Sequence, residues 1–370
     1  MSRILLKNVT KQFDTRGGGK VTAVDNFNLE IKEGECFSFL GPSGCGKTTT
    51  LRMIAGFEDL TEGEIWLGDR PVSVKEKNLY VPPEDRGLGM VFQAFAVWPH
   101  LNVFENVAFP LRVKKTPSGE LREKVMTALD HTDLTGAEKA FPSDLSGGEQ
   151  QRIALARAIV TSPSVMLLDE PLSNLDPKLR ESMRFEIKAL QKKFNFTIIF
   201  VTHDQSEAMA LSDRMLVMDM GKIIQAGAPR EMYEQPANQF VYGFLGQSNF
   251  LKVRASEGKI FPAGSEVPLD SPVAGAPEGG EGLMASRPNE IILGRTAGEG
   301  GVRGRVEKRL YMTYCVEYHV EVAGQTVRVH GPHRDALPEG SECFLGFRNA
   351  RWYDAESAEA ELERTERQVI

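Results

Sequence analysis

From about residue 34 to residue 218, short apolar runs that end at polar residues alternate with segments of helical periodicity. The runs Cys36–Leu40, Val165–Asp169 and Thr197–Val201 are almost wholly apolar, which is typical of strands buried on both faces of a sheet. After the helix-start pair Asp176-Pro177, apolar residues repeat at helical spacing. These residues are Leu179, Met183, Ile187 and Leu190. The alternation predicts a parallel sheet flanked by helices.

Further elements are expected before and inside this region. Residues 3–13 and 21–31 predict strands joined by a turn at residues 17–19, and residues 63–67 and 90–92 predict shorter strands. Thr116-Pro117 predicts a helix start, and apolar residues follow it at every fourth position. These are Leu121, Val125 and Leu129.

The pattern changes after about Pro236. Helical periods disappear, glycine and proline become frequent, and residues 315–322 alternate strictly, with Val316, Tyr318, Val320 and Val322 on one face. A turn at Gly324 and a strand over residues 326–329 complete a predicted hairpin. We therefore predict an α/β domain over residues 1–237 and a small all-β barrel domain over residues 238–370. The charged segment 356–367 is expected to be a solvated tail.

Composition sets limits on the function. A chain of 370 residues exceeds one ordinary core, and 26% charged with 41% hydrophobic residues is normal for a globular protein. The net charge of −7 gives no electrostatic case for nucleic acid. No apolar run reaches the length of a bilayer span, and the N-terminus lacks a signal-peptide pattern. The four cysteines show neither metal spacing nor a disulfide framework. We expect a cytosolic protein.

The strongest chemical signal is Gly41–Thr48, which reads Gly-x-x-x-x-Gly-Lys-Thr between a predicted strand and a predicted helix. Glycines let backbone N–H groups surround an anion, and the helix N-terminus favours negative charge. Lys47 would reach the β- and γ-phosphates, and the Thr48 hydroxyl would bind Mg²⁺. The residues predicted to bind nucleotide here are Gly41, Pro42, Ser43, Gly44, Cys45, Gly46, Lys47, Thr48 and Thr49.

Cys45 allows two interpretations. A thiol at a helix N-terminus often has a lowered pKa, which predicts easy alkylation. Its role is either catalytic or that of a small residue tolerated in the loop, and the second is favoured.

Polar residues follow three of the predicted strands. Asp169 suits Mg²⁺ coordination, and Glu170 suits orienting or deprotonating a water molecule. A purely structural role for the pair is disfavoured, because two carboxylates at the end of an apolar strand are costly to bury without a cation. Gln93 is either a solvated strand end or a sensor of Mg²⁺ and the attacking water. His203 is either an ordinary polar residue or a γ-phosphate contact at the end of a parallel strand.

Two other stretches have candidate binding residues. Ser146, Gly147, Gly148 and Glu149 precede or open a helix and form a second predicted anion site. Phe13 is either a core or edge residue or an aromatic that stacks on a nucleobase. The apolar segment 95–100 either belongs to the core or docks on a partner.

Together these residues resemble an ABC-transporter ATP-binding subunit over essentially the whole chain. Gly41–Thr48 is similar to the Walker A motif, Gln93 to the Q-loop, and Leu145–Arg152 to the signature, with Gly-Gly-Glu in place of the usual Gly-Gly-Gln. Val165–Glu170 resembles Walker B. The remaining matches are Ser173–Asp176 for the D-loop, His203 for the switch histidine and Phe13 for the adenine-stacking aromatic.

The C-terminal segments resemble the importers of polyamines, ferric iron, sulfate and sugars, which have C-terminal oligonucleotide-binding-fold barrels of the TOBE type. The segments are residues 236–241, 246–250 and 286–291, and the last reads Arg-Pro-Asn where Arg-Pro-Glu is usual. The resemblance thus implies a P-loop ABC ATPase cassette with a helical subdomain, followed by an OB-fold-like barrel.

The resemblance also implies a mechanism. Two copies pack head to tail, and each ATP with its Mg²⁺ lies between Lys47 of one copy and Ser146 of the other. Glu170, His203 and Gln93 are the implied catalytic residues, and Thr48, Gln93 and Asp169 are the implied metal-binding set. Asp176 links the two sites.

The implied partners are separate transmembrane permease subunits, docked near Gln93 and segment 95–100, and indirectly a solute-binding protein. The implied location is the cytoplasmic face of the inner membrane.

Two other functions are compatible with some of the same motifs but are disfavoured by the sequence. A soluble ABC ATPase of DNA repair or translation usually carries two cassettes or a coiled-coil insertion, and the sequence has neither. A nucleotide sensor without hydrolysis is disfavoured by the intact Asp169-Glu170 pair. The transported solute is not encoded in this type of subunit.

Overall fold

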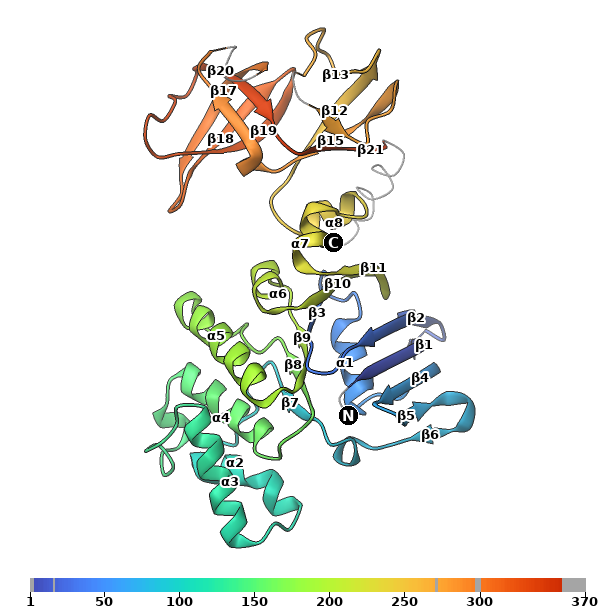
Figure 1. Ribbon diagram of the computed structural model, residues 1–370, viewed down its shortest axis with the longest axis vertical. Helices are drawn as coiled ribbons and strands as arrows, with labels where there is room; N and C mark the ends of the chain where they lie inside the picture. The colour runs from blue at the N-terminus through green and yellow to red at the C-terminus, as the bar shows by residue number, and fades with distance from the viewer. Residues whose placement is uncertain (1–2, 16, 270–271, 297–300, 355–370) are drawn as a thin grey trace. The chain divides into compact units, whose positions relative to one another are not determined.

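The computed structural model describes residues 3–15, 17–269, 272–296 and 301–354, and the predicted tail at 356–367 lies outside them. The contacts divide the chain into two compact units, Met1–Gln235 and Pro236–Ile370 (Figure 1). Each unit has its own hydrophobic core.

The first unit contains two sheets. One is antiparallel, in the order β2-β1-β4-β5-β6, and the other has the order β11-β10-β3-β9-β8-β7, with parallel pairing except at the β11 edge. The strands are β1 (Ile4–Asp14), β2 (Lys20–Ile31), β3 (Cys36–Leu40), β4 (Glu62–Leu67), β5 (Arg70–Val74), β6 (Leu79–Tyr80), β7 (Gly89–Val91), β8 (Val165–Asp169), β9 (Thr197–Val201), β10 (Arg214–Asp219) and β11 (Lys222–Gly227).

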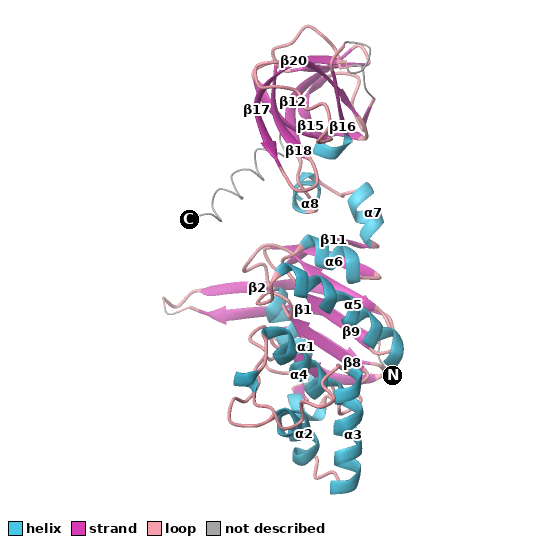
Figure 2. Ribbon diagram, turned by 90° about the vertical axis from the view of Figure 1, so that its left-hand side faces the viewer, coloured by secondary structure: helices cyan, strands magenta, loops and turns pink. Residues whose placement is uncertain are grey.

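Helices cover both faces of the parallel sheet (Figures 1 and 2). They are α1 (Lys47–Ala55), α2 (Val103–Val113), α3 (Ser118–His131), α4 (Gly147–Ile159), α5 (Pro177–Phe194), α6 (Gln205–Leu211) and α7 (Pro229–Glu234). Alternate residues of the central strands enter different cores. Leu167 and Ile199 pack with α1 and the antiparallel sheet, whereas Leu168 and Ile198 pack with α2 to α5. This two-sided burial explains the apolar runs of the sequence.

Helix α2 was not expected from the sequence. Its start is fixed by a capping box, in which Asn102 accepts from the Glu105 N–H at 2.8 Å and the Glu105 carboxylate accepts from the Asn102 N–H at 3.2 Å. The Asn-x-x-Glu spacing was the available signal, but Pro110 inside the helix weakens the helical pattern.

The second unit is built mainly of strands. Its sheets have the orders β13-β12-β15-β21-β14 and β16-β20-β17-β18-β19, and they enclose one core. The elements are α8 (Gln239–Phe244), β12 (Asn249–Ser256), β13 (Lys259–Pro262), β14 (Val273–Ala274), β15 (Gly280–Ser286), β16 (Ile291–Gly294), β17 (Val302–Tyr311), β18 (Val316–Val322), β19 (Gln325–Gly331), β20 (Glu342–Phe347) and β21 (Ala350–Asp354).

The predicted hairpin is present as β18 and β19, which pair antiparallel with Val322 opposite Gln325. The alternating residues of β18, from Val316 to Val322, are buried as expected. Helix α8 corrects the expectation that helical structure ends at about Pro236.

Candidate functional site

The phosphate loop lies between β3 and α1, as the sequence predicts. Gly46 precedes the first turn of α1 with φ of 105°, and a Cβ there would lie 2.4 Å from the carbonyl oxygen of Ala23. Only glycine fits this conformation and this close approach. The helix start has no side-chain cap, so its N–H groups stay available to an anion.

Lys47 is buried within the loop. Its ammonium donates to the carbonyl oxygens of Gly41 at 2.7 Å and Pro42 at 2.9 Å, and it lies 3.7 Å from Sγ of Cys45. These direct partners are neutral, although the Lys47 charge also acts on Asp169, so an anion in the loop would pair with the ammonium favourably.

The alkylation expected for Cys45 is corrected by the structure. The thiol is 3% exposed, and burial raises its pKa although the nearby Lys47 charge opposes the rise. A buried thiol with a raised pKa is a poor nucleophile. The alternative interpretation, a small residue that fits the loop, agrees with these observations.

Thr48 and Asp169 meet beside the loop. The Thr48 hydroxyl donates to Oδ1 of Asp169 at 3.0 Å, although the two residues are 121 positions apart. Asp169 is 7% exposed, and its pKa is raised, chiefly by burial and further by the charge of Glu170, while the Thr48 hydrogen bond lowers it. Adjacent hydroxyl and carboxylate oxygens suit a hard divalent cation.

Glu170 is the meeting point of three strand ends. Its Oε2 accepts from Nε2 of Gln93 at 2.9 Å and lies 3.3 Å from Nδ1 of His203. Gln93, Glu170 and His203 follow β7, β8 and β9, which are parallel neighbours in the sheet. Glu170 has φ of 45°, a conformation that costs free energy in a residue other than glycine and is common at functional sites.

The second predicted anion site opens α4. Ser146 caps the helix, and its hydroxyl donates to Oε2 of Glu149 at 2.6 Å, a hydrogen bond that lowers the pKa of Glu149. A Cβ at Gly148 would lie 2.6 Å from the Leu179 side chain, so glycine permits the close packing of α4 on α5. Within the described residues, no hydrogen bond joins Ser146 or Glu149 to the phosphate loop.

Asp176 and its loop lie near the same strand ends. Asp176 caps α5 by accepting from the N–H groups of Lys178 at 3.1 Å and Leu179 at 3.0 Å. The side chain of Asn174 donates to the Gln93 carbonyl oxygen at 2.8 Å. This contact was not predicted, because nothing in the local sequence relates the two loops.

Phe13 lies near the end of β1 and is 39% exposed. The Lys11 ammonium lies 4.7 Å from the centroid of its ring. Phe13 is therefore not a core residue, and its ring is accessible for stacking.

The apolar segment 95–100 is partly core and partly surface. Phe95 and Val97 pack against the helical core, while the Trp98 ring lies 4.4 Å from that of Phe109. Arg157 donates to the carbonyl oxygens of Phe95 at 3.1 Å and Ala96 at 2.6 Å. The segment is thus held from the C-terminal part of α4, the helix whose N-terminus bears Ser146.

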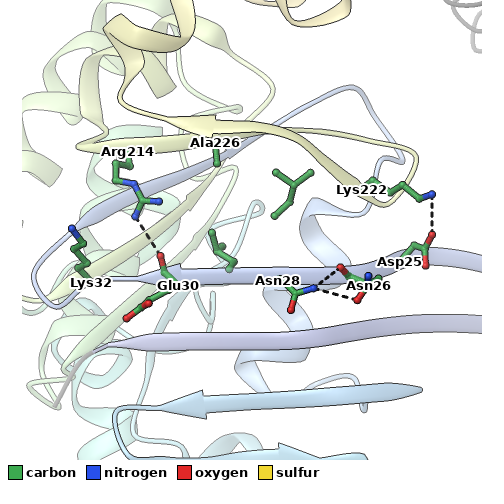
Figure 3. Close-up of a pocket in the computed structure, with 10 residues that line it drawn as sticks. Asp25, Asn26, Asn28, Glu30, Lys32, Arg214, Lys222 and Ala226 are labelled. Atoms are coloured by element: carbon green, nitrogen blue, oxygen red, sulfur yellow. Dashed lines mark hydrogen bonds and ion pairs between the residues drawn. The ribbon is translucent and has the colours of Figure 1, made fainter. Parts of the chain in front are cut away.

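A separate pocket of about 950 Å³ lies between β2 and the β10–β11 pair (Figure 3). None of the residues predicted to bind nucleotide lines it. Lys222 pairs with Asp25 at 3.1 Å, and Arg214 donates to the Glu30 carbonyl oxygen at 3.3 Å. These cations already have partners, and we assign the pocket no role.

Residues 24–173 match the family described as ABC transporter, and residues 284–353 match the TOBE domain. A spermidine/putrescine import ATP-binding protein PotA of Rubrobacter xylanophilus is 47% identical over 85% of this chain and 82% of its own length. An Fe(3+) ions import ATP-binding protein FbpC of Rhizobium etli is 42% identical over 94% of this chain and 96% of its own length.

Solved structures agree with the fold of the first unit. The dimeric post-hydrolysis structure of the ATP-binding cassette MJ0796, bound to ADP and Pi, is 34% identical over 61% of this chain and 99% of that chain, with a TM-score of 0.54. The predicted fold class, an ABC ATPase cassette followed by a small OB-fold-like β domain, is confirmed. In the described part of the chain, no helix is long and apolar enough to cross a membrane.

The resemblance inferred from the motifs is also confirmed, since both domain matches and the long alignments lead to the same kind of protein. The chain binds ATP and belongs to the import ATP-binding subunits of ABC transporters, which are ATPases that energise solute import through a separate permease.

Proposed function

We propose that two copies of this chain pack head to tail and hydrolyse MgATP at two shared sites. The main support is the separation of two anion-binding helix ends within one chain. Lys47 and Ser146 each lie at such an end, yet no hydrogen bond within the described residues joins their segments. A partner copy would supply the missing half, as the dimeric arrangement named for the MJ0796 cassette suggests.

Nucleotide binding would use the first unit of one copy. Phe13 would stack on the base, and the N–H groups of Gly41–Thr49 would surround the phosphates. Lys47 would exchange its carbonyl partners for phosphate oxygens, gaining a counter-charge. From the partner copy, Ser146, Gly147 and Gly148 would approach the γ-phosphate, with Glu149 holding the Ser146 cap.

Mg²⁺ fits beside the loop. Thr48 and Asp169 already place two oxygen ligands together, and the raised pKa of Asp169 reflects a carboxylate whose burial outweighs the opposing charges of Arg52 and Lys47. Gln93 would complete the protein ligands through its side-chain oxygen. The ion would neutralise charge that develops on the phosphates.

Glu170 would orient or deprotonate the attacking water. Its carboxylate is occupied by Gln93 and His203 in this structure, so both neighbours must rearrange when ATP enters. His203 would then contact the γ-phosphate, and Asp176 would link the two sites across the dimer.

Closure and reopening of the dimer would move the permease. Exposed aromatic side chains flank the Gln93 turn, with Phe57 52% exposed and its ring 6.0 Å from that of Phe92. Such a patch suits the docking of an apolar helix. The protein would then work at the cytoplasmic face of the inner membrane, and a solute-binding protein would deliver solute to the permease. Relatives are named for spermidine/putrescine, ferric ions and trehalose/maltose, so their names select no single solute.

Co-purification from native membranes tests this proposal. The wild-type chain should retain a multispanning membrane protein in stoichiometric amount, and Phe57→Glu should lose it. The matched control is Phe185→Glu on α5, since Phe185 is 72% exposed but belongs to another surface. Recovery of only soluble partners, unaffected by Phe57→Glu, would favour the soluble ABC ATPase instead.

A further inference from the structure

Arg180 lies in the first turn of α5, four residues after the helix cap Asp176. A cation at this end of a helix is disfavoured by the helix dipole, and no acidic residue of the same turn offsets it. The side chain is about one-quarter exposed. Partners outside the helix must therefore stabilise the guanidinium at this position.

One set of partners belongs to the loop before α5. Nη2 of Arg180 donates to the carbonyl oxygens of Leu175 at 3.2 Å and Ser173 at 3.4 Å. The same loop contains Asn174, which donates to the Gln93 carbonyl oxygen, and it ends at Asp176.

The other partners belong to the turn that contains His203. Nη1 of Arg180 lies 3.4 Å from Oδ2 of Asp204, and Nε lies 3.6 Å from Oε1 of Glu207. Glu207 is 3% exposed, and burial raises its pKa while the hydrogen bond from Thr202 and the Arg180 charge oppose the rise. Arg180 is thus a close cationic partner of this buried carboxylate.

Thr202 and Asp204 connect these contacts to His203, which lies between them in the chain. The Thr202 hydroxyl donates to Oε2 of Glu207 at 2.5 Å and accepts from the Asp204 N–H at 2.9 Å. Asp204 also caps α6 through Oδ1. Both backbone neighbours of His203 are therefore fixed by groups that contact Arg180.

The imidazole of His203 itself is more than half exposed, and its Nδ1 lies 3.3 Å from Oε2 of Glu170. Its location thus depends strongly on the backbone that carries it. A catalytic group that moves by about 1 Å can lose roughly 100-fold in rate.

We infer that Arg180 is a positioning residue that joins the Asp176 loop to the His203 turn, so that the two move as one piece when the shared site closes. This inference rests on the proposed role of His203. The planar fork of the guanidinium suits the task, because it donates to loop carbonyls with one nitrogen and faces two carboxylates with the others.

A double-mutant cycle in the full-length protein tests the inference. Arg180→Met should lower kcat for ATP hydrolysis roughly 10- to 100-fold with little change in KM for MgATP, and Arg180→Lys should restore part of the loss. His203→Ala should itself lower kcat strongly. In the His203→Ala background, Arg180→Met should have a much smaller further effect than in wild type, since one of the two groups it positions is gone.

Lys188 provides a matched control on the same helix. Its ammonium bonds to the Leu211 carbonyl oxygen at 2.9 Å and to Oδ1 of Asp213 at 3.0 Å, and its side chain is exposed to nearly the same extent as that of Arg180. Lys188→Met should leave kcat near wild type. If Arg180→Met does not fold, Thr202→Val replaces it, because this isosteric change removes the hydroxyl link to Glu207.

Hydrogen–deuterium exchange gives a second readout that does not depend on activity. Residues 172–176 and 202–207 should both exchange faster in Arg180→Met, and neither should do so in Lys188→Met. Faster exchange in only one segment, or fully multiplicative losses in the double mutant, would overturn the inference. Wild-type turnover in His203→Ala would instead reject the proposed role of His203.

Discussion

The Thr48 hydroxyl donates a hydrogen bond of 3.0 Å to Oδ1 of Asp169. Thr48 lies in the first turn of α1, which follows the phosphate loop, and Asp169 ends β8. The fold therefore holds together two oxygen groups suited to a divalent cation, which lowers the cost of forming the site.

The buried carboxylate of Asp169 predicts a gain in stability for Asp169→Asn. Because its pKa is raised in the folded chain, ionisation is disfavoured there, and the penalty appears as pH rises through the pKa and persists at neutral pH. Without nucleotide and Mg²⁺, Asp169→Asn should melt at a higher temperature than wild type at pH 7, and the difference should shrink in acid.

The exposed Asp69→Asn change serves as its control and should leave the melting temperature unchanged. With ATP and Mg²⁺ added, the order should reverse, since only wild type gains the full binding energy. A lower melting temperature for nucleotide-free Asp169→Asn at pH 7 would mean that the Thr48 hydrogen bond outweighs the burial cost.

Glu170→Gln should leave ATP binding intact and slow turnover by roughly 100-fold or more, the scale of losing one positioned catalytic group. The amide keeps the size of the side chain but cannot accept a proton. Size-exclusion chromatography with ATP should show an accumulated dimer. Near-normal phosphate release would remove Glu170 from the role of base.

Complementation between variants tests the shared site. Lys47→Ala and Ser146→Arg should each be inactive alone, because every site of either homodimer lacks one half. A mixed dimer unites the intact Lys47 of one chain with the intact Ser146 of the other, so ATPase activity should reappear below the wild-type level.

A site built within one chain predicts no recovery at any mixing ratio. The control is a dimer of wild type with the Lys47→Ala single variant, which has one complete site. If this control is active and the verified mixed dimer is not, the shared site is wrong.

Removal of residues 240–370 should leave a folded unit that binds ATP, because the first unit has its own sheets and cores. Circular dichroism and binding of a fluorescent nucleotide analogue measure the two properties. A folded fragment without nucleotide affinity would contradict the predicted boundary near residue 237.

Much of the first unit was predictable because its signals are local. The apolar runs of β3, β8 and β9 reflect burial on both faces. The phosphate loop is a contiguous motif, and its backbone conformation requires glycine at positions such as Gly46. The alternation of β18 predicted its pairing with β19 in the same way. Helix α2 was not predicted because Pro110 interrupts its helical periodicity, although its capping box is a local signal.

The sequence by itself therefore determined the central strands, several of the helices, the phosphate loop and the polar residues that follow the strands. Only the tertiary structure decided which of them meet. Gln93 and His203 share one oxygen of Glu170 because β7, β8 and β9 are adjacent, and Arg180 faces Glu207 because α5 packs beside α6. Such contacts join positions far apart in the chain. They depend on strand order and helix packing, which no local propensity or periodicity encodes.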